Sequence, residues 1–271
     1  SQDGLGNTSW SPFVRRWSLI RMSTMQTLTV SSFGFAPVKG IRHLPQQHAI
    51  LTPDGAAGDR RFCVVDVDAR RVLRTVQHPQ LMAVQAHFTP EKEDLRLTFP
   101  GEQSRAHHLA RGGSITCDYW GRSVKLYLLE TTANRAFSDY LGKPVNLAES
   151  CPRGIMYGKA FSLIGTATLE ELGRALEHPL LEEHARFRST FLIKTERPFQ
   201  EDEWVGQEFS LVPETPQVPE HLADVVVRAG EGIGRCAVID ANPLTGVRDL
   251  KILKHLAGFR PRNTANEPLL G

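Results

Sequence analysis

The chain has 271 residues, of which 41% are hydrophobic and 23% are charged, and these values are typical of a soluble globular protein. They exclude an intrinsically disordered or collagen-like chain, and the length is sufficient for two modest domains. Lysine and arginine number 32 against 30 for aspartate and glutamate, which argues against a surface that binds nucleic acid or a membrane over its whole extent. An anionic ligand would therefore need a local cluster of basic side chains.

The cysteines and the hydropathy narrow the class of protein further. The chain has four cysteines, at positions 63, 117, 151 and 236, and none of them forms a Cys-x-x-Cys pair. This pattern disfavours a zinc site, an iron–sulfur site and a disulfide framework. No apolar run reaches the roughly 18 residues of a membrane span. We expect a cytoplasmic protein with reduced thiols, without a transmembrane segment and without a nucleic-acid partner.

Residues 1–24 are predicted to lie outside the fold. They show no periodic apolar pattern, the chain does not begin with methionine, and Met22 and Met25 are candidate starts. Arginines and aromatic residues partly imitate an organelle-targeting peptide, but Asp3 and the two methionines favour vector or upstream sequence. We therefore expect a non-native or disordered extension.

Residues 25–130 are predicted to form a β-rich first domain. Short runs of strand-forming residues alternate there with Gly, Pro and Asp, at a spacing typical of an antiparallel sheet or barrel. These runs cover residues 27–33, 61–67, 81–88, 95–99 and 124–129.

A helix is predicted to mark the junction with a second domain over residues 131–271. Apolar residues recur at helical spacing from Ala133 to Leu141, and Gly142 is suited to end the helix. Three prolines between Pro213 and Pro219 predict a loop or an insertion. In this domain we expect strands near 145–148, 191–194, 209–212 and 237–239, with helices starting near 168 and covering 250–256. The predicted fold class is α+β, dominated by β structure.

Cys236 is the first candidate for chemistry. It follows Arg235 and the glycine-rich segment 230–234, and the turn 242–246 comes shortly after it. A lone cysteine is most often a buried structural thiol. The alternative is a thiolate, because a neighbouring guanidinium favours the charged form and a thiolate is a soft ligand for a transition metal. Glycines before it would let the backbone approach a bulky ligand.

Several basic residues are candidates for binding an anion. Lys39 lies in a turn after the first predicted strand, and Arg60 and Arg61 begin the next one. Arg186 and Arg188 are two residues apart, so both would face one side of an extended chain. Each of these side chains is more often simply solvated, but a guanidinium fork also binds phosphate well.

The segment 166–171 predicts the start of a helix. Thr168 and Glu171 have the spacing of a capping box, and Leu169, Leu172 and Leu176 form an apolar stripe. The functional alternative is that the free amides of this helix start bind an anion such as phosphate, helped by the threonine hydroxyls.

Taken in chain order, these motifs resemble the MOSC family, and more narrowly its two-domain branch, which includes the mitochondrial amidoxime-reducing component and bacterial relatives. The resemblance runs from about Leu28 to Gly271 and depends on the order and spacing of the whole set. The motifs are Pro-Val-Lys39-Gly, Gly-Asp-Arg60-Arg, Thr168-Leu-Glu-Glu, Arg186-Phe-Arg188, Glu201-Asp-x-Trp204 and Arg235-Cys236 followed by Pro243-x-Thr245-Gly246.

The resemblance implies an N-terminal β domain, a β-barrel-like MOSC domain with a few helices, and a molybdopterin form of the molybdenum cofactor between them. Cys236 would be the molybdenum ligand and catalytic residue. Lys39, Arg60 and Arg188 would lie near the pterin phosphate and the oxo groups. The full set of expected cofactor-binding residues is Lys39, Arg60, Arg61, Thr166, Thr168, Arg186, Arg188, Thr190 and Arg235.

The chain also departs from the family pattern. Arg188 is followed by Ser189 and Thr190 where the family commonly has Pro-Asn, so an amide contact becomes a hydroxyl contact at Thr190. Relatives continue beyond the position of Gly271 into closing strands, so the resemblance implies a truncated MOSC domain with an exposed sheet edge. No ferredoxin-like cysteine cluster follows. The expected electron donor is therefore a separate ferredoxin, flavodoxin or cytochrome b5 type protein.

Three functions follow as hypotheses. The first is a molybdenum-dependent oxidoreductase that reduces small N-hydroxylated compounds. The second is a carrier of the cofactor or of sulfur without turnover, because MOSC modules also occur fused to cofactor sulfurases; this role needs an exposed thiol that can form a persulfide. The third is a degenerate β module that binds nothing.

Overall fold

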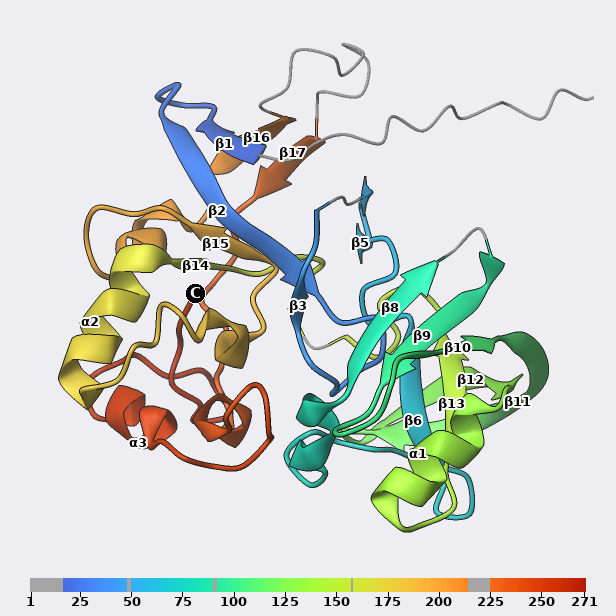
Figure 1. Ribbon diagram of the computed structural model, residues 1–271. Coiled ribbons are helices and arrows are strands. Elements are labelled where there is room, and N and C mark those ends of the chain that lie inside the picture. Colours follow the sequence, from blue (N-terminus) through green and yellow to red (C-terminus); the bar gives the residue numbers. More distant parts are fainter. Residues whose placement is uncertain (1–16, 48–49, 90–91, 157, 214–224) are drawn as a thin grey trace, which may run out of the picture.

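The computed structural model describes residues 17–47, 50–89, 92–156, 158–213 and 225–271, which fold into two β-rich units (Figure 1). In these ranges the α-helices are α1 (Ala133–Leu141), α2 (Thr166–Leu176) and α3 (Ile252–Ala257). The predicted α+β, β-dominated fold class is confirmed. No helix among the described residues is long and apolar enough to cross a membrane.

The first unit is built on a closed β-barrel. Five strands form it: β6 (Phe62–Asp66), β7 (Arg71–Val72), β11 (Ala110–Tyr119), β12 (Arg122–Glu130) and β13 (Asn146–Ser150). A three-stranded sheet of β8 (Gln85–Thr89), β9 (Asp94–Thr98) and β10 (Arg105–His108) packs with it. The predicted barrel is thus present, and the structure adds β7, β10 and β11 to the predicted strands.

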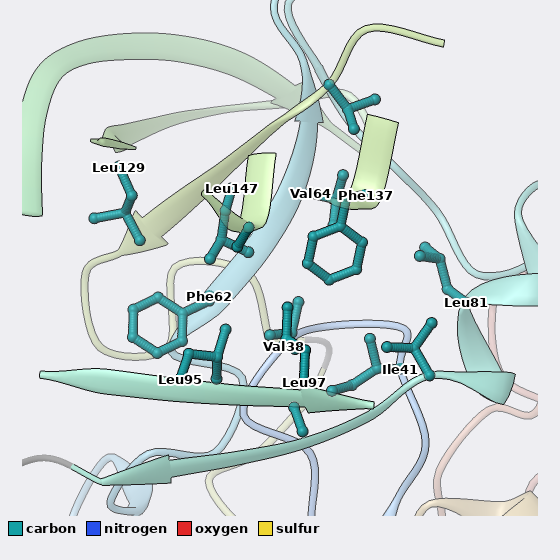
Figure 2. Packing of buried hydrophobic residues seen from close by; sticks show 14 of the residues in the cluster. Val38, Ile41, Phe62, Val64, Leu81, Leu95, Leu97, Leu129, Phe137 and Leu147 are labelled. Carbon is teal, nitrogen blue, oxygen red and sulfur yellow. The ribbon is translucent and has the colours of Figure 1, made fainter. Parts of the chain in front are cut away.

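Strand β6 shows how the sequence builds the two cores of this unit. Alternate side chains of a strand point to opposite faces, so Cys63 and Val65 face the barrel interior while Phe62 and Val64 face the second core. Because both faces are buried, the strand is apolar at nearly every position. Figure 2 shows Phe62 and Val64 in the layer that also contains Phe137 of α1.

Helix α1 follows its sequence signals closely. It covers Ala133–Leu141, and Gly142 ends it in the left-handed conformation at φ 67°. Phe137 is fully buried, with its ring 5.3 Å from that of Phe99. Burial of a phenylalanine side chain contributes about 1.5–3 kcal/mol, so this contact fixes α1 against the end of β9 in the three-stranded sheet.

The second unit is built on an open sheet. Its strand order is β14 (Leu163–Gly165), β15 (Phe191–Ile193), β2 (Thr27–Phe35), β1 (Trp17–Arg21), β16 (Glu208–Pro213) and β17 (Val225–Arg228). Off this path, β3 (Leu44–Pro45) pairs with β2, and β4 (Leu51–Thr52) forms a separate hairpin with β5 (Gly55–Ala56). Helices α2 and α3 pack beside β14 and β15 through one apolar cluster, and Figure 1 shows both at the outer side of this unit.

Strand β1 corrects the prediction that residues 1–24 lie outside the fold. Residues 17–21 pair with both β2 and β16, and Leu19 is only 2% exposed. A five-residue strand has too short a pattern to be recognised without its partners. Residues 1–16 lie outside the described residues.

Each unit contains a strand from the part of the chain that was predicted to form the other unit. Strand β2 lies in the middle of the second sheet, although it belongs to the predicted first domain. Strand β13 closes the first barrel between β12 and β6, although it follows the predicted junction. The division into domains after residue 130 stays a prediction.

Three local predictions are wrong. The predicted strand at 81–88 begins as a 3-10 helix over Pro79–Ala83, and only then becomes β8. The predicted strand at 237–239 is a 3-10 helix over Ala237–Asp240. Helix α2 begins at Thr166, close to the predicted start near 168, but Gly165 is its N-cap, so the predicted cap residue Thr168 is inside the helix. Short apolar runs fit helical turns and strands equally well, which explains the first two errors. Most of the predicted proline-rich loop, at 214–224, lies outside the described residues.

Candidate functional site

A pocket of about 1240 Å³ lies between the two units and contains the main candidate residues. Lys39 and Arg60 line it from the first half of the chain, and Arg188, Arg235 and Cys236 line it from the second. Arg186 lines it as well, so the structure brings together six of the residues that the sequence proposed.

Backbone pairing places Lys39 beside Arg60. The Lys39 N–H donates to the Phe62 carbonyl at 2.7 Å, and the Arg60 N–H donates to the Ala36 carbonyl at 2.8 Å. The buried Asp59 carboxylate accepts from Arg60 Nε at 3.0 Å and from the Ala36 N–H at 3.4 Å. Asp59, which the sequence reasoning missed, thus holds the Arg60 side chain in position.

Lys39 has an unusual protonation equilibrium. Burial, followed by the nearby charges of Arg60 and Arg188, lowers the pKa of Lys39 from 10.5 to about 7. Its Nζ lies 4.9 Å from the ring centroid of Tyr119. The ammonium is therefore held against an aromatic face and exchanges its proton near neutral pH.

Arg188 approaches the same point from the second unit. It has a left-handed backbone at φ 53°, after the 3-10 helix His184–Phe187, and its Nη1 donates to the Ile41 carbonyl at 2.7 Å. Burial and the charge of Arg60 lower the pKa of Arg188 to about 10, while Asp59 and Cys236 act in the opposite direction. Two guanidiniums and one ammonium thus share a single buried carboxylate in this part of the pocket.

Arg235 offers a hydrogen-bond donor to the pocket. It is 7% exposed, and its Nε and Nη1 donate to the carbonyls of Leu270 and Phe187, each at 2.8 Å. Its buried Nη2 has no hydrogen-bond partner in the part of the chain that the structure describes. A Cβ at Gly271 would lie 2.8 Å from this atom, so the glycine leaves space there. A buried donor without a partner is costly, and an anion would satisfy it.

Cys236 lies beside these cations. Its thiol is half-buried and reduced, and the residue caps the 3-10 helix Ala237–Asp240 at a wall of the pocket. Arg188 and Arg235 are near enough for their charges to interact with it. The site combines a soft sulfur ligand with a cluster of hydrogen-bond donors.

Two predicted arginines have their charges neutralised by carboxylates, and of the two only Arg186 lines the pocket. Arg61 does not line the pocket; its Nε donates to Glu149 at 2.8 Å, and Arg111 binds the same carboxylate. Arg186 is fully buried and donates to Asp249 at 2.7 and 2.9 Å and also to Glu183. The chain is helical rather than extended at this point, so Arg186 and Arg188 do not act as a pair.

The start of α2 is occupied by the protein itself. Glu201 is buried and accepts from the Gly165 N–H at 3.1 Å and from the Thr168 hydroxyl at 2.9 Å. Thr168 is 0% exposed and Thr166 accepts from the Thr195 N–H, so neither hydroxyl faces the pocket. This corrects the predicted capping box, because a carboxylate from a distant segment takes the place of the expected anion.

Thr190 also lies outside the pocket lining. It is 1% exposed, its N–H donates to Ser162 Oγ at 3.1 Å, and its hydroxyl accepts from the Ser162 N–H at 3.2 Å. Ser162 lines the pocket and was missed by the sequence reasoning, as were Tyr119 and Trp120. The Trp120-Gly121 turn between two strand-like runs was the available signal for the aromatic pair.

Comparisons with known proteins agree with this architecture. Residues 27–144 match the MOSC N-terminal beta barrel domain. The chain is 26% identical over 243 residues to a molybdenum cofactor sulfurase of Caenorhabditis elegans, covering 85% of this chain and 31% of that protein. It is 24% identical over 253 residues to a molybdenum cofactor sulfurase of Caenorhabditis briggsae, covering 89% and 33%. The chain thus spans about a third of the length of these relatives.

Among solved structures, a solution structure from Bordetella bronchiseptica is 17% identical and covers 42% of this chain and 96% of its own, with a TM-score of 0.29. This score is too low to support an argument about the fold. The family assignment depends on the matched β domain and the two relatives. Residues 27–144 match the MOSC N-terminal beta barrel domain, and the two relatives support the MOSC domain family for the chain.

Proposed function

We propose that the chain binds the molybdenum cofactor in the pocket between its units, with Cys236 as the metal ligand, and that it reduces N-hydroxylated compounds. The observation that carries this proposal is the cluster of Lys39, Arg60, Arg188 and Arg235 around a half-buried thiol. Such a cluster is unfavourable without an anion, because burial of like charges is costly.

The residues fit a ligand that carries phosphate and a metal. Arg235 Nη2 is a buried donor that needs an acceptor, and Arg60 and Arg188 can each present N–H groups to phosphate or oxo oxygens. Hydrogen bonds to charged groups contribute about 1.5–3 kcal/mol each. Cys236 can supply a thiolate, which is the soft ligand that a transition metal prefers over the surrounding nitrogen donors.

When bound, the cofactor would supply the two-electron chemistry that removes oxygen from an N–OH group. The chain's own residues bind, orient and move protons. Lys39 Nζ, with a pKa of about 7, can hold a proton near the reacting end of the pocket and release it at neutral pH. The electrons would come from a separate ferredoxin, flavodoxin or cytochrome b5 type protein.

Metal analysis tests this function. Wild-type protein from a host that makes the cofactor should contain molybdenum, and Cys236→Ala should lose it, together with reduction of a model amidoxime by a chemical donor. Cys151→Ala is the matched control, because Cys151 is an exposed thiol outside the pocket. A wild type without molybdenum, or equal molybdenum contents in Cys236→Ala and Cys151→Ala, would contradict the proposal.

A second function is favoured by the relatives, which are molybdenum cofactor sulfurases. In this alternative Cys236 would carry sulfur or pass the cofactor on without turnover. Mass spectrometry after incubation with a cysteine desulfurase separates the two. A carrier should gain a persulfide at Cys236 in preference to Cys151, whereas a metal ligand covered by cofactor should not.

A further inference from the structure

Trp120 is in a conformation that a bulky residue rarely adopts. It lies in the turn between β11 and β12, at φ 54°, and Gly121 follows at φ 76°. Two consecutive left-handed residues are typical of a turn that prefers Asn-Gly, so an aromatic residue here is strained. Strain of this kind is concentrated at functional sites. Trp120 is also 48% exposed and lines the pocket described above.

Cations accompany the aromatic rings at this point. The Arg74 guanidinium lies 4.6 Å from the Trp120 ring centroid, and Arg74 Nε donates to Gln77 at 3.2 Å. Next to Trp120, the Tyr119 ring contacts Lys39 at 4.9 Å and Arg122 at 5.1 Å. The half-buried Lys39 thus contacts the ring of Tyr119, which is the sequence neighbour of the exposed Trp120.

Further exposed residues of the pocket lining also carry positive charge. Arg153 and Lys159 are exposed and line the pocket together with Arg74. None of these three forms an ion pair with the carboxylates in the described ranges. The same lining has two exposed carboxylates, Glu231 and Asp202, and Asp202 is paired with Arg260, so cations without a carboxylate partner are in excess there.

We propose that Trp120 and Arg74 form a second binding position, at the opening of the pocket, for a planar aromatic ring that carries an anionic group. The ring stacks on Trp120, and the anion meets Arg74. The position lies in the same pocket as Cys236, so it would hold one end of a substrate while the other reaches the inner cations. As a statement of substrate class, this rests on the proposed function; the binding itself does not.

Calorimetric titration tests the binding with three probes: phenyl phosphate, inorganic phosphate and benzamide. The readout is the affinity for phenyl phosphate divided by the affinity for inorganic phosphate, measured on the full chain. The molybdenum content of the same preparation is determined separately. We expect a ratio of about ten in the wild type, because stacking on an aromatic side chain has an effect of roughly this size. Benzamide, which lacks the anion, should bind much more weakly than phenyl phosphate.

The variants use the turn geometry. Asparagine suits the left-handed turn, so Trp120→Asn should keep the fold while the affinity ratio falls to about one. Trp120→Tyr keeps an aromatic ring and should keep most of the wild-type affinity ratio. Arg74→Gln should weaken phenyl phosphate binding. Phe259→Asn removes an exposed aromatic residue outside the pocket and should change nothing.

The proposal is overturned if wild-type protein does not bind phenyl phosphate, binds it no more tightly than phosphate, or keeps its ratio in Trp120→Asn. The molybdenum content of wild type and Cys236→Ala reports on the inner site independently. A normal molybdenum content with a ratio of one would leave the proposed function intact and remove only the position at Trp120.

Discussion

The cations of this protein fall into two groups that differ in their carboxylate partners. Arg61 and Arg186 each donate to at least one carboxylate, and Arg186 is fully buried in a pair with Asp249 and a contact to Glu183. In the pocket, Lys39, Arg60 and Arg188 share the single carboxylate of Asp59.

The difference shows which cations stabilise the fold and which are available to a ligand. A guanidinium whose donors are all taken by carboxylates stabilises the contact between segments and has little left for an anion. A guanidinium with an unpartnered buried donor, such as Arg235, is destabilised until a ligand arrives. Burial alone does not separate the groups, since Arg186 and Arg235 are both buried.

The largest expected effect is on Arg186, in the paired group. Arg186→Met should lower the free energy of unfolding by roughly 3 kcal/mol, because it leaves Asp249 and Glu183 without their partner. Urea denaturation measures this change. The protein that remains folded should keep its affinity for inorganic phosphate. A stable Arg186→Met variant that no longer binds phosphate would place Arg186 in the ligand-binding group.

Arg188→Met should show the opposite pattern. Removing an incompletely paired charge from the pocket should change stability by no more than about 1 kcal/mol, while phosphate affinity falls about tenfold, the loss of one charge-assisted hydrogen bond. Calorimetry measures the affinity, and the same urea titration measures stability. A large loss of stability without loss of affinity would show that Arg188 is structural, through its bond to the Ile41 carbonyl.

Comparison of the two groups also explains what the sequence could and could not predict. Helix α1 and its Gly142 cap were predictable, since both depend on neighbours in sequence, and so were the alternating strands β9 and β12. The candidates Lys39, Arg60, Arg188, Arg235 and Cys236 do meet in one pocket.

The pairing of each polar group was not predictable, because the partners lie far apart in the chain. Asp249 is 63 residues from Arg186, and Glu201 is 33 residues from Thr168. Whether an arginine or a helix start is free for a ligand depends on these contacts. For the same reason strand β1 was missed, since its stability comes from pairing with β2 and β16.

The pH dependence of stability tests the pocket group of cations through Lys39. Because the pKa of Lys39 falls from 10.5 to about 7 on folding, the unfolded chain binds more protons between these values. The lysine's contribution to stability is therefore fully present above pH 10.5 and is lost as the pH falls toward 7. From pH 7 to pH 9, wild type should gain about 2 kcal/mol relative to Lys39→Met.

Urea titrations across this pH range measure that gain. Lys254→Met, which removes an exposed lysine of α3, is the matched control and should follow the wild type. If Lys39→Met also follows the wild type, the amine is not desolvated, and the charge of the pocket differs from the one described above. Phosphate should bind more weakly above pH 7, because the neutral amine no longer attracts it.

The smallest expected effect is on Arg61, the predicted cofactor residue that the structure places in the paired group. Its side chain is 30% exposed and its partner Glu149 is also bound by Arg111, so Arg61→Gln should cost no more than about 1 kcal/mol. Because Arg61 does not line the pocket, phosphate affinity and molybdenum content should match the wild type. Arg60→Gln, at the neighbouring position, should lower both. If Arg61→Gln and Arg60→Gln lose phosphate affinity and molybdenum equally, the ligand extends beyond the pocket toward Glu149. At this edge of the site, carboxylate partners would then not distinguish structural cations from ligand-binding ones.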